Sequence, residues 1–144
     1  VCSAAGDGFF MSGDAGATWA TPDAGLRHHY CWAVAADPAD PEALVLSAAS
    51  GPRTAHDAPS AASVVYRRSA GGDWQPVTAG LPPERGTLAS SLVASPSEPH
   101  VFYAANNHGV YQSDDAGASW QRLDIPWPER AQLQRPEGVV VAAL

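Results

Sequence analysis

The sequence comprises 144 residues, of which 45% are hydrophobic, and carries a net charge of −7 when histidine is neutral. This length and content suffice for one ordinary domain with a core of its own. All eight basic residues are arginine, and the acidic excess repels phosphate backbones and anionic lipids, so neither nucleic acid nor membrane is expected as a partner.

The start of the chain shows no targeting segment. No apolar run reaches the roughly 20 residues that cross a bilayer, and the first residues lack the basic and apolar regions of a secretion signal. We therefore expect no membrane span and favour the cytoplasm as the location. Because the sequence starts with Val, we also expect that an upstream segment has been removed.

The predicted elements are short strands throughout. In chain order, the segments 1–5, 31–36, 43–49, 64–69 and 73–77 are each four to seven residues long, rich in apolar residues and bounded by Gly, Pro, Asp or Ser. A strand is also expected at 138–144, where the sequence reads GVVVAAL. No stretch shows helical periodicity over ten residues, so the chain is predicted to be all-β.

Two cysteines, Cys2 and Cys31, lie in the strand-like segments. They are too few for a disulfide framework, and their spacing does not match a metal-ligand pair. We expect buried free thiols, although a single bridge between them remains open. No cofactor is predicted.

An internal repeat organises the chain. The octapeptide SGDAGATW at Ser12–Trp19 returns as SDDAGASW at Ser113–Trp120, and a shift of 101 residues aligns the two copies with the aromatic strands before them. A shift of 58 residues aligns 34–48 with 92–106, including two prolines. Between them, 64–77 repeats the same order of elements in a degenerate form, two residues shorter.

Each repeat contains four short strands, which predicts the blades of a β-propeller. We expect about three blades of a ring that has about six to eight. The predicted parts are a partial blade at 1–25, blades at 26–80 and 81–125, and a linker with a closing inner strand at 126–144. Since three blades do not close a ring, the remaining blades are expected from a missing N-terminal segment or from a second copy.

The pattern Ser-x-Asp-x-Gly-x-Thr/Ser-Trp resembles the Asp-box, or BNR, repeat of sialidase-like and sortilin-like propellers. The resemblance covers nearly the whole chain, but the middle copy at Ser69–Trp74 lacks the aspartate. It implies the fold, and it leaves the function open among glycosidases, receptors and assembly factors.

The residues of the two box turns are predicted to be structural. The carboxylate accepts hydrogen bonds from the amides of its own turn, the glycine supplies a positive φ, and the tryptophan packs between neighbouring blades. The residues with these roles, together with the serine that opens each turn, are Ser12, Asp14, Gly16, Trp19, Ser113, Asp115, Gly117 and Trp120.

A binding site is expected on the face opposite the box turns, where the loops between second and third strands meet the loops between blades. An insertion at 50–62 lengthens one of these loops, and four of the five histidines fall on this face. The candidate ligand-binding residues are His28, His29, Tyr30, Arg53, His56, Asp57, Asn107, His108, Trp127 and Arg130. His100 falls on the box face, where we expect it to contact only solvent.

Alternatives to a binding site remain for these residues. All of them could be solvated loop residues, and Trp127 could instead cover the core of the propeller. The histidines show no close-spaced pair of the kind that binds a metal, so no metal site is predicted.

Catalysis is the main competing hypothesis. A glycosidase needs two carboxylic acids beside the scissile bond, but the candidates lie in no distinctive motif, and the Phe-Arg-Ile-Pro signature of sialidases is absent. These candidates are Asp23, Asp57, Glu84, Asp124, Glu129 and Glu137. The sequence therefore favours a non-catalytic module that binds a protein or a glycan; the alternative is a sialidase-like glycoside hydrolase whose catalytic residues lie partly outside this chain.

Overall fold

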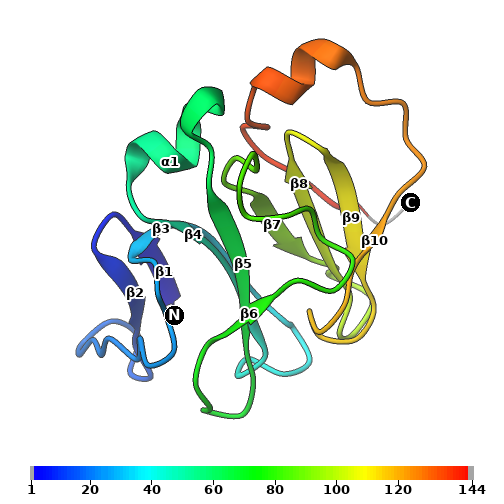
Figure 1. Ribbon diagram of the computed structural model, residues 1–144. Coiled ribbons are helices and arrows are strands. Elements are labelled where there is room, and N and C mark those ends of the chain that lie inside the picture. The colour runs from blue at the N-terminus through cyan, green and yellow to red at the C-terminus, as the bar shows by residue number, and fades with distance from the viewer. Residues whose placement is uncertain (1, 143–144) are drawn as a thin grey trace.

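The computed structural model describes residues 2–142, which form three antiparallel sheets side by side (Figure 1). The first sheet contains β1 (Cys2–Ala5) and β2 (Gly8–Met11). The second contains β3 (Tyr30–Ala36), β4 (Leu44–Ala49), β5 (Ser63–Arg68) and β6 (Gln75–Val77). The third contains β7 (Ser91–Ala94), β8 (Phe102–Asn106), β9 (Gly109–Ser113) and β10 (Gln121–Arg122).

The two four-stranded sheets are simple meanders in which each strand pairs with the next along the chain. β3, the first strand of the second sheet, contacts both β1 and β7. The remaining regular elements are three single helical turns, α1 (Pro52–His56), η1 (Ala58–Ser60) and η2 (Glu129–Leu133). Within residues 2–142, none of these is long enough to cross a membrane. The prediction of an all-β chain is confirmed.

The core lies between the sheets. β4 is buried along its whole length because it is covered on both faces. Successive side chains of a strand point to opposite faces, so Leu44 and Leu46 contact the first sheet while Val45 contacts the third. The largest side chains in these two layers are aromatic: Phe9 and Trp74 meet edge to face at 5.0 Å in the first layer, and Trp120 occupies the second.

A repeated contact joins each four-stranded sheet to the sheet before it. The amide of Trp74 donates to the carbonyl of Ala24 at 2.8 Å, and the amide of Trp120 donates to the carbonyl of Ala79 at 3.0 Å. In both cases the acceptor lies in the seven residues that follow the tryptophan position of the preceding sheet and lead out of it. We call these residues the exit segment: 20–26 for the first sheet, and 75–81, which includes β6, for the second.

A glycine with positive φ makes this contact possible. Gly25 has a φ of 89° and Gly80 a φ of 75°, and in each case an added Cβ would overlap the carbonyl group of the tryptophan. A side chain at either position would therefore push the two sheets apart.

The first box turn is closed by the side chains of Ser12 and Asp14. The amide and hydroxyl of Thr18 donate to the two carboxylate oxygens of Asp14 at 2.8 and 2.6 Å, and the hydroxyl of Ser12 donates to it at 2.8 Å. These hydrogen bonds, with the Thr18 hydroxyl contributing most, lower the pKa of Asp14 to about 2. The amide of Gly16, whose φ is 93°, donates to the Ser12 hydroxyl.

The second box turn repeats this arrangement. Ser119 and Ser113 donate to Asp115 with the same three distances, and the amide of Gly117, whose φ is 80°, donates to the Ser113 hydroxyl at 2.9 Å. Burial acts to raise the pKa of Asp115, but the hydrogen bonds from Ser119 and Ser113 outweigh it, so the pKa is lowered.

The middle turn reaches a similar backbone shape without a carboxylate. Ala70 and Gly71 have φ values of 47° and 70°, close to those of the alanine and glycine of the two box turns. Here the amide of Gly72 donates to the carbonyl of Ser69, and the guanidinium of the buried Arg68 donates to the carbonyl of Gly72 at 2.7 Å.

Within residues 2–142, only one of the two box tryptophans packs between two sheets. Trp120 is 5% exposed between the second and third sheets, and Trp74 of the degenerate copy is 2% exposed between the first and second. Trp19 is 48% exposed, because no sheet among the described residues lies against the outer side of the first sheet.

The inner strand expected at 138–144 is absent from its described part, 138–142, and Val140 is 88% exposed. The chain before it is held at β7, where the hydroxyl of Ser91 donates to the carbonyl of Pro136 at 3.0 Å. Residues 138–142 consequently remain far from β1 (Figure 1). Residues 143–144 lie outside the described residues.

The two cysteines are free thiols, as predicted. Cys31 is buried in the first core layer, and burial, aided by the charge of Asp23, raises its pKa to about 11. Burial also raises the pKa of the half-buried Cys2.

The expectation that His100 contacts only solvent is wrong. Its amide and its ring Nδ1 both lie within hydrogen-bonding distance of one carboxylate oxygen of Asp37, at 2.9 and 2.6 Å, and its carbonyl accepts from the amide of Ala116. The His100 side chain is 54% exposed, whereas that of Asp37 is 1% exposed. The turn that follows β3 is thereby tied to the turn that precedes β8, which joins the second and third sheets.

The contact between Gly80 and Trp120 can be tested against a matched glycine. We expect Gly80→Ala to lower the free energy of unfolding by about 3 kcal/mol, through a strained φ and the overlap with Trp120. Gly86 has a φ of 90° but an added Cβ there meets nothing within 4 Å, so Gly86→Ala should cost only about 1 kcal/mol. Urea denaturation measures the free energy of unfolding of both variants. An equal loss in Gly80→Ala and Gly86→Ala would show that the contact between Gly80 and Trp120 does not contribute to stability.

The Asp37–His100 pair predicts a pH-dependent stability. Burial acts to raise the pKa of Asp37, but the hydrogen bonds from the Ala39 amide and from the ring and amide of His100 together lower it below its ordinary 3.8. The stability that Asp37 contributes is therefore fully present above pH 3.8 and is lost as the pH falls through the lowered value.

We expect Asp37→Ala to cost about 2 kcal/mol at neutral pH. Denaturation of this variant between pH 2 and 7 should show a smaller loss of stability toward low pH than the wild type. The half-buried Asp40 in the same turn supplies a control, Asp40→Ala. An unchanged pH profile in Asp37→Ala would contradict the role of the pair.

Candidate functional site

The loops opposite the box turns form one face of the molecule, which we call the loop face. The expected insertion at 50–62 folds there as α1 and η1, and η2 lies at the same end of the molecule (Figure 1). α1 begins with Pro52, which suits the first helical position. Backbone hydrogen bonds fix it to the sheets: the carbonyl of its buried Ala55 accepts from the amide of Ala89 just before β7.

Four side chains from three separate segments meet around His56, and we call them the His56 cluster. The ring Nε2 of His56 lies 2.9 Å from the hydroxyl of Tyr30, and its Nδ1 lies 2.8 Å from the guanidinium of Arg135. The indole of Trp32 meets the His56 ring nearly perpendicularly at 4.6 Å. Arg135 also lies over Trp32, with its Cζ 3.9 Å from the ring centroid, a cation–π contact.

The surroundings disfavour a charged imidazole. Partial burial lowers the pKa of His56, and the neighbouring guanidinium of Arg135 lowers it further. Glu137, which pairs with Arg135 at 3.2 Å, acts weakly in the opposite direction. The cluster is therefore built around a neutral histidine that holds the segment after η2 against α1 and β3.

A second group of polar side chains surrounds Glu84 in the loop between the second and third sheets. One carboxylate oxygen lies 3.4 Å from Nε2 of His28, and the other lies 3.9 Å from Arg27. The other ring nitrogen of His28 is 2.7 Å from the hydroxyl of the buried Tyr66. His28 thus links the exposed carboxylate to the first core layer, to which Tyr66 belongs.

Glu84 and Arg27 also line a cleft of about 530 Å³ between the second sheet and the loop at 78–87. Its walls are apolar and include Val65, Val77, Leu81 and Pro83. Ser63, Ser90 and Asn106 also line it, but they are buried: the hydroxyl of Ser63 donates to the carbonyl of Thr87, and the amide of Asn106 donates to the hydroxyl of Ser90. The volume falls within the range of small-molecule sites, about 300–1,000 Å³.

Three of the sequence candidates come together at the end of β8, in a structural arrangement. The side chain of Asn107, which is 3% exposed, accepts from the amide of Leu88 and donates to the carbonyls of Gly86 and Gln132. Trp127 is half-buried, and its indole donates to the carbonyl of Asn107 at 2.9 Å. His108 lies 3.0 Å from the carbonyl of Gly86. These residues fix the loops at 85–88 and 127–132 to the turn between β8 and β9.

The remaining candidates do not join one site. His29 is exposed and lies 3.8 Å from Asp23. Arg53 and Asp57 form an exposed pair at 3.7 Å along α1, and Arg130 is exposed on η2. Across residues 2–142, no three His, Cys, Asp or Glu side chains gather in a way that could hold a metal ion.

The sequence candidates omitted Trp32 and Arg135 of the His56 cluster. The alternation of side chains along β3 places Trp32 on the same side as Tyr30, so the predicted strand at 31–36 carried a signal for Trp32. No sequence signal points to Arg135. Its partners Trp32 and His56 lie about 80 to 100 residues earlier in the chain, and a sequence pattern does not show which distant loops come into contact.

Comparison with known proteins gives structural matches alone: no protein-family model and no curated protein matches the sequence. The structure is similar to an ancestral GH74 enzyme, with a TM-score of 0.61 and 21% identity, over 83% of this chain and 16% of that chain. It is also similar to the GH74 xyloglucanase from Xanthomonas campestris, with a TM-score of 0.62 and 23% identity, over 84% of this chain and 18% of that chain.

These enzymes are β-propeller glycoside hydrolases. At this level of identity the likeness shows the fold alone, and it confirms that the three sheets are part of a propeller-type fold. The chain spans about one sixth of the length of either enzyme.

The His56 cluster predicts how a neighbouring charge controls the histidine. Arg135→Gln removes the guanidinium that disfavours imidazolium, so the pKa of His56 should rise toward its ordinary 6.5. NMR titration of the histidine ring measures this, and Arg53→Gln, an exposed arginine on the same helix, is the control. Because the pKa of His56 is lowered in the folded state, its protonation destabilises the fold as the pH drops below 6.5, and Arg135→Gln should weaken that loss.

Proposed function

We propose that this chain is the glycan-binding part of a propeller of the glycoside hydrolase type, and that it supplies binding rather than catalytic groups. The cleft beside Glu84 carries the proposal. Sugars present both hydroxyl groups and apolar ring faces, and the cleft combines apolar walls with the exposed carboxylate of Glu84 and the exposed guanidinium of Arg27. The structural neighbours favour a glycan over a protein as the ligand.

The carboxylates argue for binding in this chain. Hydrolysis of a glycoside requires a pair of carboxyl groups on opposite sides of the bond. Glu84 lines the cleft without a second carboxyl group among the lining residues, and it is paired with Arg27 and His28. If the whole protein is a hydrolase, we infer that at least one catalytic acid comes from outside this chain, which keeps the catalytic alternative open for the longer protein.

We also assign the two turns at Ser12–Trp19 and Ser113–Trp120 to the Asp-box, or BNR, type found in sialidase-like propellers. The support is their common set of hydrogen bonds to Asp14 and Asp115. The blade boundaries at 26–80 and 81–125 belong to the same proposal, because each such segment contains one complete four-stranded sheet.

A binding assay with neutral glycans tests the proposed function. Calorimetric titration of the 144-residue protein with xyloglucan oligosaccharides should show saturable binding, and Glu84→Gln should weaken it about tenfold through the loss of a charge-assisted hydrogen bond. Glu42→Gln, which changes an exposed carboxylate on the box face, should bind like the wild type.

Three results would count against the proposal. Binding that is equal in Glu84→Gln and wild type would remove the cleft as the site. Binding of sialylated but not neutral glycans would instead favour the hypothesis of a sialidase-like protein. Release of reducing sugar by the isolated chain would show that it contains a complete catalytic pair.

A further inference from the structure

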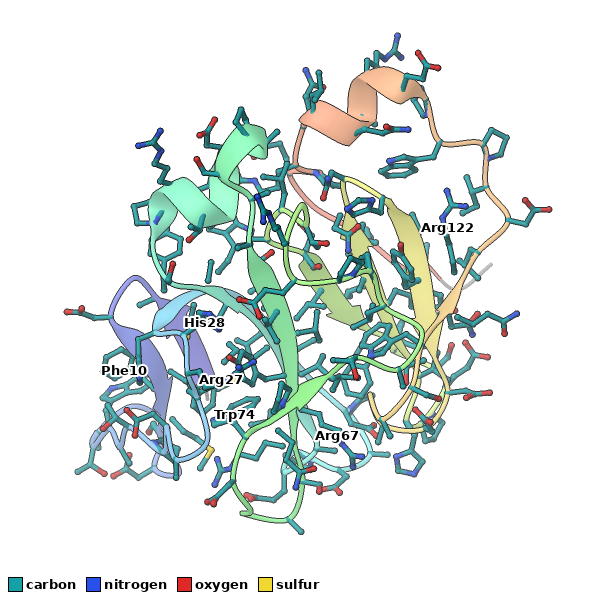
Figure 2. The ribbon with its side chains drawn as sticks, in the orientation of Figure 1. Phe10, Arg27, His28, Arg67, Trp74 and Arg122 are labelled. Atoms are coloured by element: carbon teal, nitrogen blue, oxygen red, sulfur yellow. The ribbon has the colours of Figure 1, made fainter. Side chains whose placement is uncertain are left out.

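The outer side of the first sheet carries two large aromatic side chains that remain partly exposed. Phe10 is half-buried and lies on the side of β2 turned away from the second sheet (Figure 2). Trp19, at the end of the first box turn, is 48% exposed. We call this surface, formed by Phe10 and Trp19, the outer face.

In the second sheet, the residues equivalent to Phe10 and Trp19 are Tyr66 and Trp74, and both are buried. Tyr66 pairs with Pro76, which comes two residues after Trp74. In the first sheet Met11 bridges to Ala20, one residue after the box tryptophan, so Phe10 occupies the position of Tyr66. Tyr66 is 0% and Trp74 2% exposed, and both lie in the layer against the first sheet.

The third sheet repeats the pattern. Tyr111 pairs with Arg122, two residues after Trp120, and these two aromatic residues are 4% and 5% exposed in the layer against the second sheet. In each complete sheet, therefore, an aromatic residue and a tryptophan face the preceding sheet. The outer face is the equivalent surface of the first sheet.

The two existing interfaces also show what covers such a surface. The exit segments that receive Trp74 and Trp120 both read Ala-Gly-Leu, at 24–26 and 79–81. The alanine carbonyl accepts from the tryptophan amide, the glycine has a positive φ and lies against the tryptophan carbonyl, and the leucine packs in the same layer as the indole.

A second copy of this chain has no free segment of this kind. Both Ala-Gly-Leu segments are already occupied by tryptophans of the chain itself. After the third sheet, the residues at the same distance from the tryptophan are Ile125, Pro126 and Trp127. Proline has a fixed negative φ and carries a Cβ, so Pro126 does not allow the approach that Gly25 and Gly80 allow.

We propose that the outer face docks a further propeller blade that lies outside residues 1–144, whose exit segment presents a small residue followed by a glycine with positive φ to Trp19. This inference rests on the two observed interfaces and is independent of the proposed glycan binding. Docking of this blade covers Phe10 and Trp19 as the first sheet covers Tyr66 and Trp74.

A tandem fusion supplies such a blade from the protein's own sequence. Residues 1–5 align with β8 under the shift of 101, so a copy of residues 27–101 placed ahead of Val1 gives the first sheet an inner strand and a preceding blade. Hydroxyl-radical footprinting with mass spectrometry then reports the oxidation rate of Trp19. We expect this rate to fall several-fold from its value in the 144-residue protein, to that of Trp120.

The matched control is the same fusion with Gly80→Val in the added copy, where Trp19 should remain as reactive as in the 144-residue protein. Gly86→Val in the added copy, at a glycine whose Cβ would meet nothing within 4 Å, should leave Trp19 protected. A fusion that unfolds cooperatively but leaves Trp19 fully reactive overturns the proposal.

If the fusion does not fold, two further measurements test whether the outer face docks a further blade. A peptide of residues 75–83, QPVTAGLPP, at millimolar concentration should slow the oxidation of Trp19, and the same peptide with Gly80→Val should not; absence of protection overturns the proposal. A second copy of this chain is the alternative occupant of the outer face. Sedimentation velocity of the 144-residue protein and of Trp19→Ser measures the oligomeric state, and a dimer that Trp19→Ser abolishes would identify a second copy and overturn the proposal.

Discussion

The contact between a tryptophan backbone and a glycine of the preceding exit segment sets the spacing of the sheets. Trp74 and Trp120 each donate their amide to an alanine carbonyl while their own carbonyl lies where a glycine Cβ would otherwise be. The indole then lies in the layer between two sheets, where Trp74 and Trp120 are 2% and 5% exposed. β4 lies between the two layers that these contacts close, and it is buried along its whole length.

Each of these tryptophans lies at the end of a tight turn, and the turn positions it for the contact with the exit segment. All three turns share the sequence Ala-Gly-x-x-Trp and a positive φ at both the alanine and the glycine. In two of them a carboxylate closes the bend, and in the third Arg68 donates to a backbone carbonyl instead. The backbone shape is therefore the common element, and the aspartate is one of two ways to hold it. The aspartate is prominent in the sequence pattern because a sequence shows side-chain types directly, whereas it does not show the backbone shape.

The loop face divides into a part that holds the fold and a part that is open to a ligand. Asn107 and His56 look like binding residues in the sequence, yet their polar atoms are engaged by the backbone or by Tyr30 and Arg135. Glu84, which no motif marks, lies at a cleft of about 530 Å³ between two sheets. A residue type thus indicates what chemistry is available, whereas the packing decides whether that chemistry is free to meet a ligand.

The sequence by itself determined the strands of the three sheets, the repeat and the turn chemistry, because alternation, glycine positions and turn-closing side chains act over a few residues; the strand expected at 138–144 is the exception. It also marked the loop face as the place of the insertion at 50–62. Only the tertiary structure decided that Trp19 is exposed while Trp120 is buried, that His100 binds Asp37, and that Arg135 reaches Trp32. These outcomes depend on which sheets and loops become neighbours across 60 to 100 residues, and local patterns carry no information about neighbours at that range.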